Sequence, residues 1–340
     1  MNGQETLEEE KKEKISGGKP DGRTRAGHYM QKFGVLLALI LLCVFFAVLS
    51  PTFLTINNIM NILGQSSINC LISFGMLLVI LTSGIDLSVG ATLALSSMFM
   101  AVFLSVFHVN SFVGLLLGLL CGTAVGFVNG VLLTKLHLPH PFISTLGTQN
   151  IVRGLALVIT GATPISGFSG TVDFLGGANI GLVPVSIVLV AVCAVFLSIF
   201  LNRTVTGKHI YAVGGNKEAA KLSGINIDRT LITVYTLSGF LAGLAGIVQL
   251  GRVDAAFPLA GVGYENNAIA AVIIGGASFF GGVGKVSGTI IGVMIIAVLN
   301  DGLNLLGVSA DMQTVAIGAV IILAVTVDVM RSGGFRKLKK

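Results

Sequence analysis

The sequence is dominated by long apolar segments that alternate with short polar ones, and this alternation restricts the fold more than any other feature. All but the shortest segment, 266–281, approach or exceed the roughly 17–25 residues that a membrane-spanning helix needs. Only 11% of the residues are charged, against about 25% in soluble domains. We therefore expect an all-α, polytopic membrane protein with about ten transmembrane helices. The segments are 34–50, 58–82, 89–107, 112–134, 142–161, 182–201, 230–250, 266–281, 287–306 and 312–330.

The distribution of positive residues supports this arrangement, because Lys and Arg favour cytoplasmic loops. With ten spans and both termini in the cytoplasm, nineteen of the 21 Lys and Arg residues fall in cytoplasmic segments. Arg252 falls outside these segments, and Arg153 lies within a span, where it needs an acidic partner, carbonyls or water. We expect a disordered cytoplasmic tail at 1–33, a transmembrane domain at 34–330 and a basic cytoplasmic tail at 331–340.

The longest polar interruption, residues 202–229, contains a short helical pattern. Asn216 is a good N-cap, Lys217 to Leu222 are good helix formers, and Gly224 is suited to end the helix. The segment carries five Lys and Arg residues against two acidic ones, which places it in the cytoplasm. A helix of one or two turns at this place would be a docking surface for a partner.

Glycines recur every four residues through one apolar segment. This spacing places them near one face, where they allow another helix to approach closely. We interpret this face as a packing surface rather than as part of a permeation path. The glycines are Gly114, Gly118, Gly122, Gly126 and Gly130, and Gly239 with Gly243 repeats the spacing.

Several polar side chains interrupt the second apolar segment. Asn61, Gln65, Ser66 and Asn69 are candidates to line a wet cavity for a hydroxylated solute. Hydrogen bonding between helices explains the same residues equally well. The sequence leaves both interpretations open.

The sequence shows no pattern typical of a catalytic, metal or nucleotide site. The run GGVGKVSG at 281–288 is not a phosphate loop, because Phe279 stands where a glycine is needed and Val286 where Ser or Thr is needed. His137 and His140 have no acidic or thiol partner nearby, and the four cysteines are far apart. Basic residues flank apolar segments, which argues against nucleic-acid binding. We expect no enzyme activity and no metal on this chain.

Three stretches, at 78–90, 211–225 and 302–309, read LVILTSGIDLSVG, YAVGGNKEAAKLSGI and GLNLLGVS. Together they resemble the permease subunits of ribose-type sugar importers in the ATP-binding-cassette superfamily. The resemblance extends from about residue 34 to residue 330. Its motifs are specific, because TSGIDLSVG joined to the later loop is not a general membrane pattern.

In the second stretch, Glu218-Ala219-Ala220 followed by Gly224 is similar to the EAA-x-x-x-G signature of importer permeases. The resemblance implies that this helix docks in a cleft of the ATPase and transmits its closure. The alanines and the glycine suit close approach to a partner, while Lys217 and Glu218 offer ion pairs.

In the first stretch, Gly84, Asp86, Ser88 and Gly90 lie at the junction of the second and third apolar segments. Asp86 either caps the third span through backbone N–H groups, assisted by Ser88, or contacts the ATPase or a gate. Both roles remain open.

The resemblance implies a permease that translocates a ribose-like monosaccharide across the bacterial cytoplasmic (inner) membrane. The implied partners are a second copy of the permease in a homodimer, an ABC ATPase that binds ATP and Mg, and an extracytoplasmic sugar-binding protein. No cofactor is expected on this chain. The alternative is an ion-coupled secondary transporter of a small polar solute. That class needs a relay of ionisable side chains deep in the spans, for which Asp86 and Arg153 are poor candidates.

Overall fold

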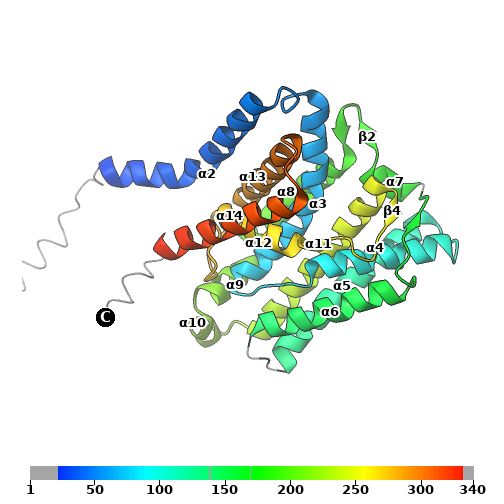
Figure 1. Ribbon diagram of the computed structural model, residues 1–340. Coiled ribbons are helices and arrows are strands. Elements are labelled where there is room, and N and C mark those ends of the chain that lie inside the picture. Colours follow the sequence, from blue (N-terminus) through cyan, green and yellow to red (C-terminus); the bar gives the residue numbers. More distant parts are fainter. Residues whose placement is uncertain (1–21, 137, 139, 169, 332–340) are drawn as a thin grey trace, which may run out of the picture.

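The computed structural model describes residues 22–331, apart from 137, 139 and 169. The fold is all-α as expected, with two pairs of two-residue strands (Figure 1). The helices are α2 Gly22–Leu49, α3 Ile56–Leu81, α4 Val89–Ser105, α5 Ser111–Lys135, α6 Pro141–Val158, α7 Thr171–Gly176, α8 Val185–Arg203, α9 Val205–Gly215, α10 Lys217–Leu222, α11 Ile227–Val253, α12 Tyr264–Ile274, α13 Val286–Leu305 and α14 Ala310–Arg331. The strands are β1 Ile165–Ser166, β2 Asn179–Ile180, β3 Val183–Pro184 and β4 Ala255–Ala256.

The predicted tails fall largely outside the described residues. The structure differs from the prediction at 22–33, which we expected to be disordered and which form the first part of α2. The apolar segment that follows continues the same helix without a break. Residues 1–21 and 332–340 are not described, so the rest of the two predicted tails stays a prediction.

Each of the ten apolar segments contains a helix, but the helices differ in length. Six of the described helices are long and apolar enough to cross a membrane, namely α3, α5, α8, α11, α13 and α14. Helix α4 and the apolar part of α2 are shorter, and α12 has 11 residues. The all-α class is confirmed, whereas the count of about ten spans stays a prediction.

Helices α3 and α11 form the centre of the bundle. Figure 1 shows α2, α13 and α14 on one flank of this centre and α4, α5 and α6 on the other. Many of the largest fully buried side chains come from α3, α4 and α11. They include Leu71, Phe74, Met76, Leu77, Leu93, Met98 and Tyr235.

The segments that were assigned to the cytoplasm gather at one end of the bundle, which we name the basic end. There the Ser83 hydroxyl hydrogen-bonds the carbonyls of Gly214, at 3.3 Å, and Phe280, at 2.7 Å. Lys135 and Asp228 approach to 3.7 Å at the same end. At the opposite end, β1 and β4 form an antiparallel pair. This grouping is the one that the predicted topology requires, and the cytoplasmic location of the basic end stays a prediction.

The glycine face of α5 packs as predicted. All five glycines are buried, and a methyl group on Gly126 would collide with the backbone of Tyr235 and Gly239 of α11. Gly122 likewise lies against the backbone of Gly239 and Gly243. Helices α5 and α11 therefore approach backbone to backbone, which dispersion forces favour in lipid.

Two non-helical segments enter the interior of the bundle. The first link, residues 82–88, joins α3 to α4, and the second link, residues 254–263, joins α11 to α12. Gly90 at the start of α4 lies against Gly261 in the second link, because a methyl group on either would meet the other's backbone. We name this meeting place the central seam. With 11 residues, α12 is about 16 Å long at 1.5 Å per residue, so it starts about halfway through a 30 Å hydrocarbon core.

The two short helices leave the central seam in opposite directions. The other end of α4 brings Leu104 against Gly114 at the start of α5, at the opposite end of the bundle. The other end of α12 brings Gly275 against Gly288 at the start of α13, at the basic end. Helices α3 to α5 and α11 to α13 therefore form two similar units that run in opposite directions.

Replacing Gly126 with Leu tests the close packing of α5 on α11. The larger side chain meets backbone rather than flexible side chains, so we expect the variant to lose about 1–3 kcal/mol or more of unfolding free energy. The measurement is thermal unfolding of the purified protein in detergent. Gly147→Leu on α6 is the matched control, since nothing lies within 4 Å of that position. Equal stability of the two variants would contradict the packing.

Candidate functional site

The predicted short helix is present as α10, with the predicted ends. The Asn216 Oδ1 accepts a hydrogen bond of 2.9 Å from the backbone N–H of Ala219, which is the N-cap geometry. Gly224 has a φ of +80°, in the left-handed region that favours glycine, and follows the last turn. Within α10 only Ala220 is buried, and Leu222 is 90% exposed. The helix is therefore held at both ends and presented on the surface of the basic end.

The residues before α10 differ from the polar loop that we predicted, because most of them are helical. Helix α9 occupies Val205–Gly215, capped by Thr204 through a 3.0 Å bond from Gly207. The Tyr211 hydroxyl donates a 2.9 Å hydrogen bond to the carbonyl of Gly284, and burial raises the pKa of this phenol. Gly214 lies against the carbonyl of Leu81 at the end of α3. Helix α9 thus fixes α10 to the transmembrane core.

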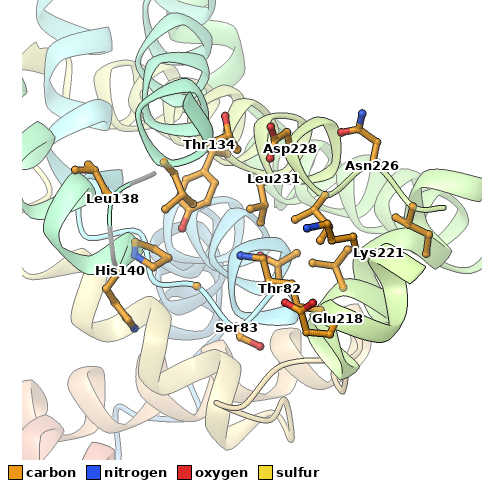
Figure 2. Close-up of a pocket in the computed structure, with 18 residues that line it drawn as sticks. Thr82, Ser83, Thr134, Leu138, His140, Glu218, Lys221, Asn226, Asp228 and Leu231 are labelled. Atoms are coloured by element: carbon orange, nitrogen blue, oxygen red, sulfur yellow. The ribbon is translucent and has the colours of Figure 1, made fainter. Parts of the chain in front are cut away.

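A pocket of about 630 Å³ lies between α10 and the core. Figure 2 shows Glu218 and Lys221 of α10 on one side of this hollow and Leu138 and His140 on the other. Its remaining wall comes from the first link, the end of α5 and the start of α11. The wall combines both charge signs with apolar side chains, which suits a protein segment better than a small anion.

The first link connects this pocket to the buried interior. Its surface end carries Ser83 and Gly84, which line the pocket, while Asp86 is only 1% exposed. Asp86 accepts bonds from the Ser88 N–H, at 3.0 Å, and the Ser88 hydroxyl, at 2.6 Å. The predicted cap of α4 is not formed, because the N-cap residue is Ser88 and no side chain caps the first turn; Asp86 instead accepts the N–H of Ser88, two residues along the link.

Two further helices close the network around Asp86. Ser238 of α11 donates a 3.0 Å bond to the second oxygen of Asp86. Asn129 of α5 donates a 2.8 Å bond to the Ser88 hydroxyl. We name these four residues the Asp86 cluster. It joins the first link to both α5 and α11, so the closely packed helix pair and the first link are bound together.

The sequence analysis missed Asn129, Ser238 and Tyr235. The buried Tyr235 hydroxyl lies against Gly84, where a methyl group would approach it to 2.7 Å. Asn129 and Ser238 are polar residues within apolar segments, which was a usable signal for a buried partner. Nothing in the local sequence showed that both would meet Asp86.

Three of the four polar residues of α3 lie near one face because they are four residues apart, and Ser66 lies off that face. Asn61 and Gln65 are exposed on the surface of this chain, and Asn69 is half-buried. Ser66 is buried, and its hydroxyl donates a 2.8 Å bond to the Leu63 carbonyl of its own helix. Their role as cavity-lining residues stays a prediction, with Asn61 and Gln65 in the more accessible positions.

The described residues bring no three His, Cys, Asp or Glu side chains together in a group that could hold a metal ion. Cys70 is buried, and Cys43, Cys121 and Cys193 are half-buried free thiols. The expectation that this chain carries no cofactor of its own stays a prediction. The site consists of an exposed helix, a pocket beneath it and a hydrogen-bonded connection from the pocket to the interior of the bundle.

Fold and site together define a class of protein: a multi-pass membrane protein whose helical bundle presents a short exposed helix at its basic end. The chain belongs to the family described as the branched-chain amino acid transport system permease component, whose model matches residues 58–325. The resemblance to ribose-type permease subunits is confirmed by its relatives, and the chain is a multi-pass protein of the bacterial inner membrane.

The similar proteins are transport permeases by name. The chain is 45% identical over 297 residues to the ribose import permease protein RbsC of Escherichia coli (strain K12), covering 86% of this chain and 92% of that one. It is 45% identical over 305 residues to RbsC of Bacillus subtilis (strain 168), covering 89% and 94%. It is 38% identical over 321 residues to the galactose/methyl galactoside import permease protein MglC of Escherichia coli (strain K12), covering 89% and 95%. No solved structure matches the chain.

Replacing Asp86 with Ala tests the Asp86 cluster. The change leaves the Ser88 and Ser238 donors without their acceptor in a buried place, at a cost of about 1–3 kcal/mol for each unpaired group. Denaturant unfolding of the purified protein measures the loss. Thr233→Ala on α11 is the control, because within the described part of the chain that hydroxyl bonds just the carbonyl of Arg229 in its own helix. A loss no larger than that of the control would contradict the cluster.

Proposed function

We propose that this protein is the membrane-spanning permease subunit of an ATP-binding-cassette importer for a monosaccharide of the ribose type. The observation that carries the proposal is α10, an exposed helix that is capped at both ends and anchored to the core through α9. A helix in this position suits the transfer of force from a partner. The relatives add the solute class, since they are named for the import of ribose and of galactose or methyl galactoside.

In this proposal the basic end faces the cytoplasm, the chain crosses the membrane about ten times, and both termini are cytoplasmic. The positive side chains of α10 and its neighbours support that orientation. ATP and Mg bind to a separate ATPase, which contacts Lys217, Glu218, Ala219, Ala220 and Gly224. A second copy of the permease completes the translocation path, and an extracytoplasmic binding protein delivers the sugar.

The proposed transmission runs from α10 to the first link. Movement of α10 displaces α9, which contacts the end of α3 at Leu81 and bonds Ser83 through the Gly214 carbonyl. The first link then carries the movement to the Asp86 cluster, because a rigid hydrogen-bonded group moves as a unit. Gly84 allows the link to lie against Tyr235, and Gly90 allows the start of α4 to lie against Gly261, without a clash. In this way one surface helix acts on α4, α5 and α11.

The proposed path accepts a hydroxylated solute. Asn61 and Gln65 are exposed amide side chains on α3, and amides both donate to and accept from sugar hydroxyls. We propose that they face the path at the interface with the second copy. Ser66 and Asn69 contribute less to binding of the solute in this proposal. The Ser66 side chain is buried in this chain, and the Asn69 side chain is half-buried.

Reconstitution in lipid vesicles tests the proposed function. The chain is combined with an ABC ATPase and a sugar-binding protein from the same organism, and uptake of labelled D-ribose, D-allose and D-galactose is measured. We expect uptake of at least one sugar that requires ATP and the binding protein. Accumulation by the permease alone, driven by a proton or sodium gradient, would instead establish the ion-coupled transporter.

Two variants test the role of α10. Glu218→Lys reverses an exposed charge, and Gly224→Val places a branched side chain at a φ of +80°. We expect both to insert normally and to reduce ATP-dependent uptake by about tenfold or more, equivalent to about 1.4 kcal/mol of coupling. Asp311→Lys, the same charge reversal at an exposed position of α14, is the control. Normal uptake in both α10 variants would exclude α10 as the coupling helix.

A further inference from the structure

One face of α6 carries three polar side chains at a spacing of four residues, and together they contact both links. The Thr145 hydroxyl hydrogen-bonds the Ile85 carbonyl of the first link, at 3.2 Å. The Gln149 amide donates a 3.4 Å bond to Glu265 at the start of α12. Four-residue spacing places such side chains one above another along the helix. Arg153, the third, reaches the second link.

Arg153 makes the strongest of these contacts. Its guanidinium Nη1 donates to the carbonyls of Pro258, at 2.8 Å, and Ala260, at 2.7 Å. Both carbonyls belong to non-helical backbone, which inside a membrane has no water to bind and is tolerated only where the protein supplies partners. Arg153 therefore supplies what the second link lacks. It also places a positive charge in the neighbourhood of the buried Glu265 side chain.

The contacts of Arg153 bear directly on the central seam. Gly261 follows Ala260 in the second link and lies against Gly90 at the start of α4. A methyl group on Gly90 would meet both the Gly261 carbonyl and Glu265, so no free space separates the two short helices. Arg153 therefore binds the carbonyl of the residue directly before the one that meets Gly90.

The start of α6 lies at the pocket beneath α10. His140 caps α6 by accepting a 3.2 Å bond from the N–H of Phe142, and both His140 and Pro141 line the pocket. A partner that fills the pocket or moves α10 therefore acts on the start of α6. From there the polar face runs about 18 Å along the helix to Arg153 at 1.5 Å per residue.

We propose that α6 is a latch on the central seam and that Arg153 is its positioning residue. Arg153 holds the second link against α6, so that the starts of α4 and α12 stay in contact. Displacement of α6 at the pocket then releases the seam during transport. The contribution to transport rests on the proposed function, whereas the effect of Arg153 on the second link does not.

Hydrogen–deuterium exchange on the full complex in lipid nanodiscs tests the latch directly. In Arg153→Met we expect backbone amides of 254–265 to exchange about tenfold faster or more, while peptides from α9 and α10 are unchanged. Arg153→Lys keeps a charged donor and should restore most of the protection. Asn150→Met is the matched control on α6, because among the residues that the structure describes that amide bonds the Leu146 carbonyl of its own helix and no other group. Unchanged exchange of 254–265 in Arg153→Met would overturn the proposal.

Transport measurements on the same variants separate a latch from a general structural role. We expect Arg153→Met to reduce sugar uptake about tenfold while ATP hydrolysis by the complex stays within about twofold. The reason is that the ATPase still hydrolyses ATP, but its movement is no longer transmitted to the central seam. A parallel fall of uptake, hydrolysis and protein yield, without rescue by Arg153→Lys, would overturn the latch. If Arg153→Met does not insert, Arg153→Gln replaces it, since its shorter side chain removes the charge and keeps a single amide NH2 group. The two proposals can fail separately. If the unmutated complex imports no sugar while Arg153→Met still speeds exchange of 254–265, the result supports the latch and refutes the proposed function.

Discussion

The backbone inside a membrane must find all of its hydrogen-bond partners within the protein, and this constraint governs the arrangement of the bundle. Helices satisfy it internally, but the chain leaves helical geometry at the first link and the second link. In both places other helices supply the missing groups. Thr145 binds the Ile85 carbonyl of the first link, where Asp86 itself accepts the N–H of Ser88, and Arg153 binds two carbonyls of the second link. The position of α6, which reaches both links, follows from this requirement.

Close packing of glycine faces makes the same arrangement possible. Because α5 and α11 touch backbone to backbone, the short side chains of Asn129 and Ser238 reach the same carboxylate region from two helices. A wider separation would leave these side chains too far apart to bind one cluster. The glycine spacing therefore serves packing, as predicted, and also brings the polar cluster within reach. The glycine faces of α5 and α11 therefore contribute both to the stability of the bundle and to the connection of these two helices with the first link.

The parts of the site that depend on local rules were predictable from the sequence. Asn216 caps α10 and Gly224 takes a left-handed conformation after it, as their residue types indicated. The glycine face of α5 was also predictable, because residues that are four apart in a helix lie near the same face. The length of α12 was not, since hydropathy records the polarity of a segment and not the continuity of its backbone. The same limit explains why Ser66 and Asn61, five residues apart in one polar run, differ in exposure.

The sequence by itself determined the class of the protein, the places of its apolar helices and the short exposed helix, because each follows from composition, periodicity or capping within a few residues. Only the tertiary structure decided that α4 and α12 start beside each other at Gly90 and Gly261. Only it showed that Arg153 binds carbonyls more than a hundred residues away. Such pairings depend on how the whole bundle closes, and no local pattern encodes the partner of a buried polar group.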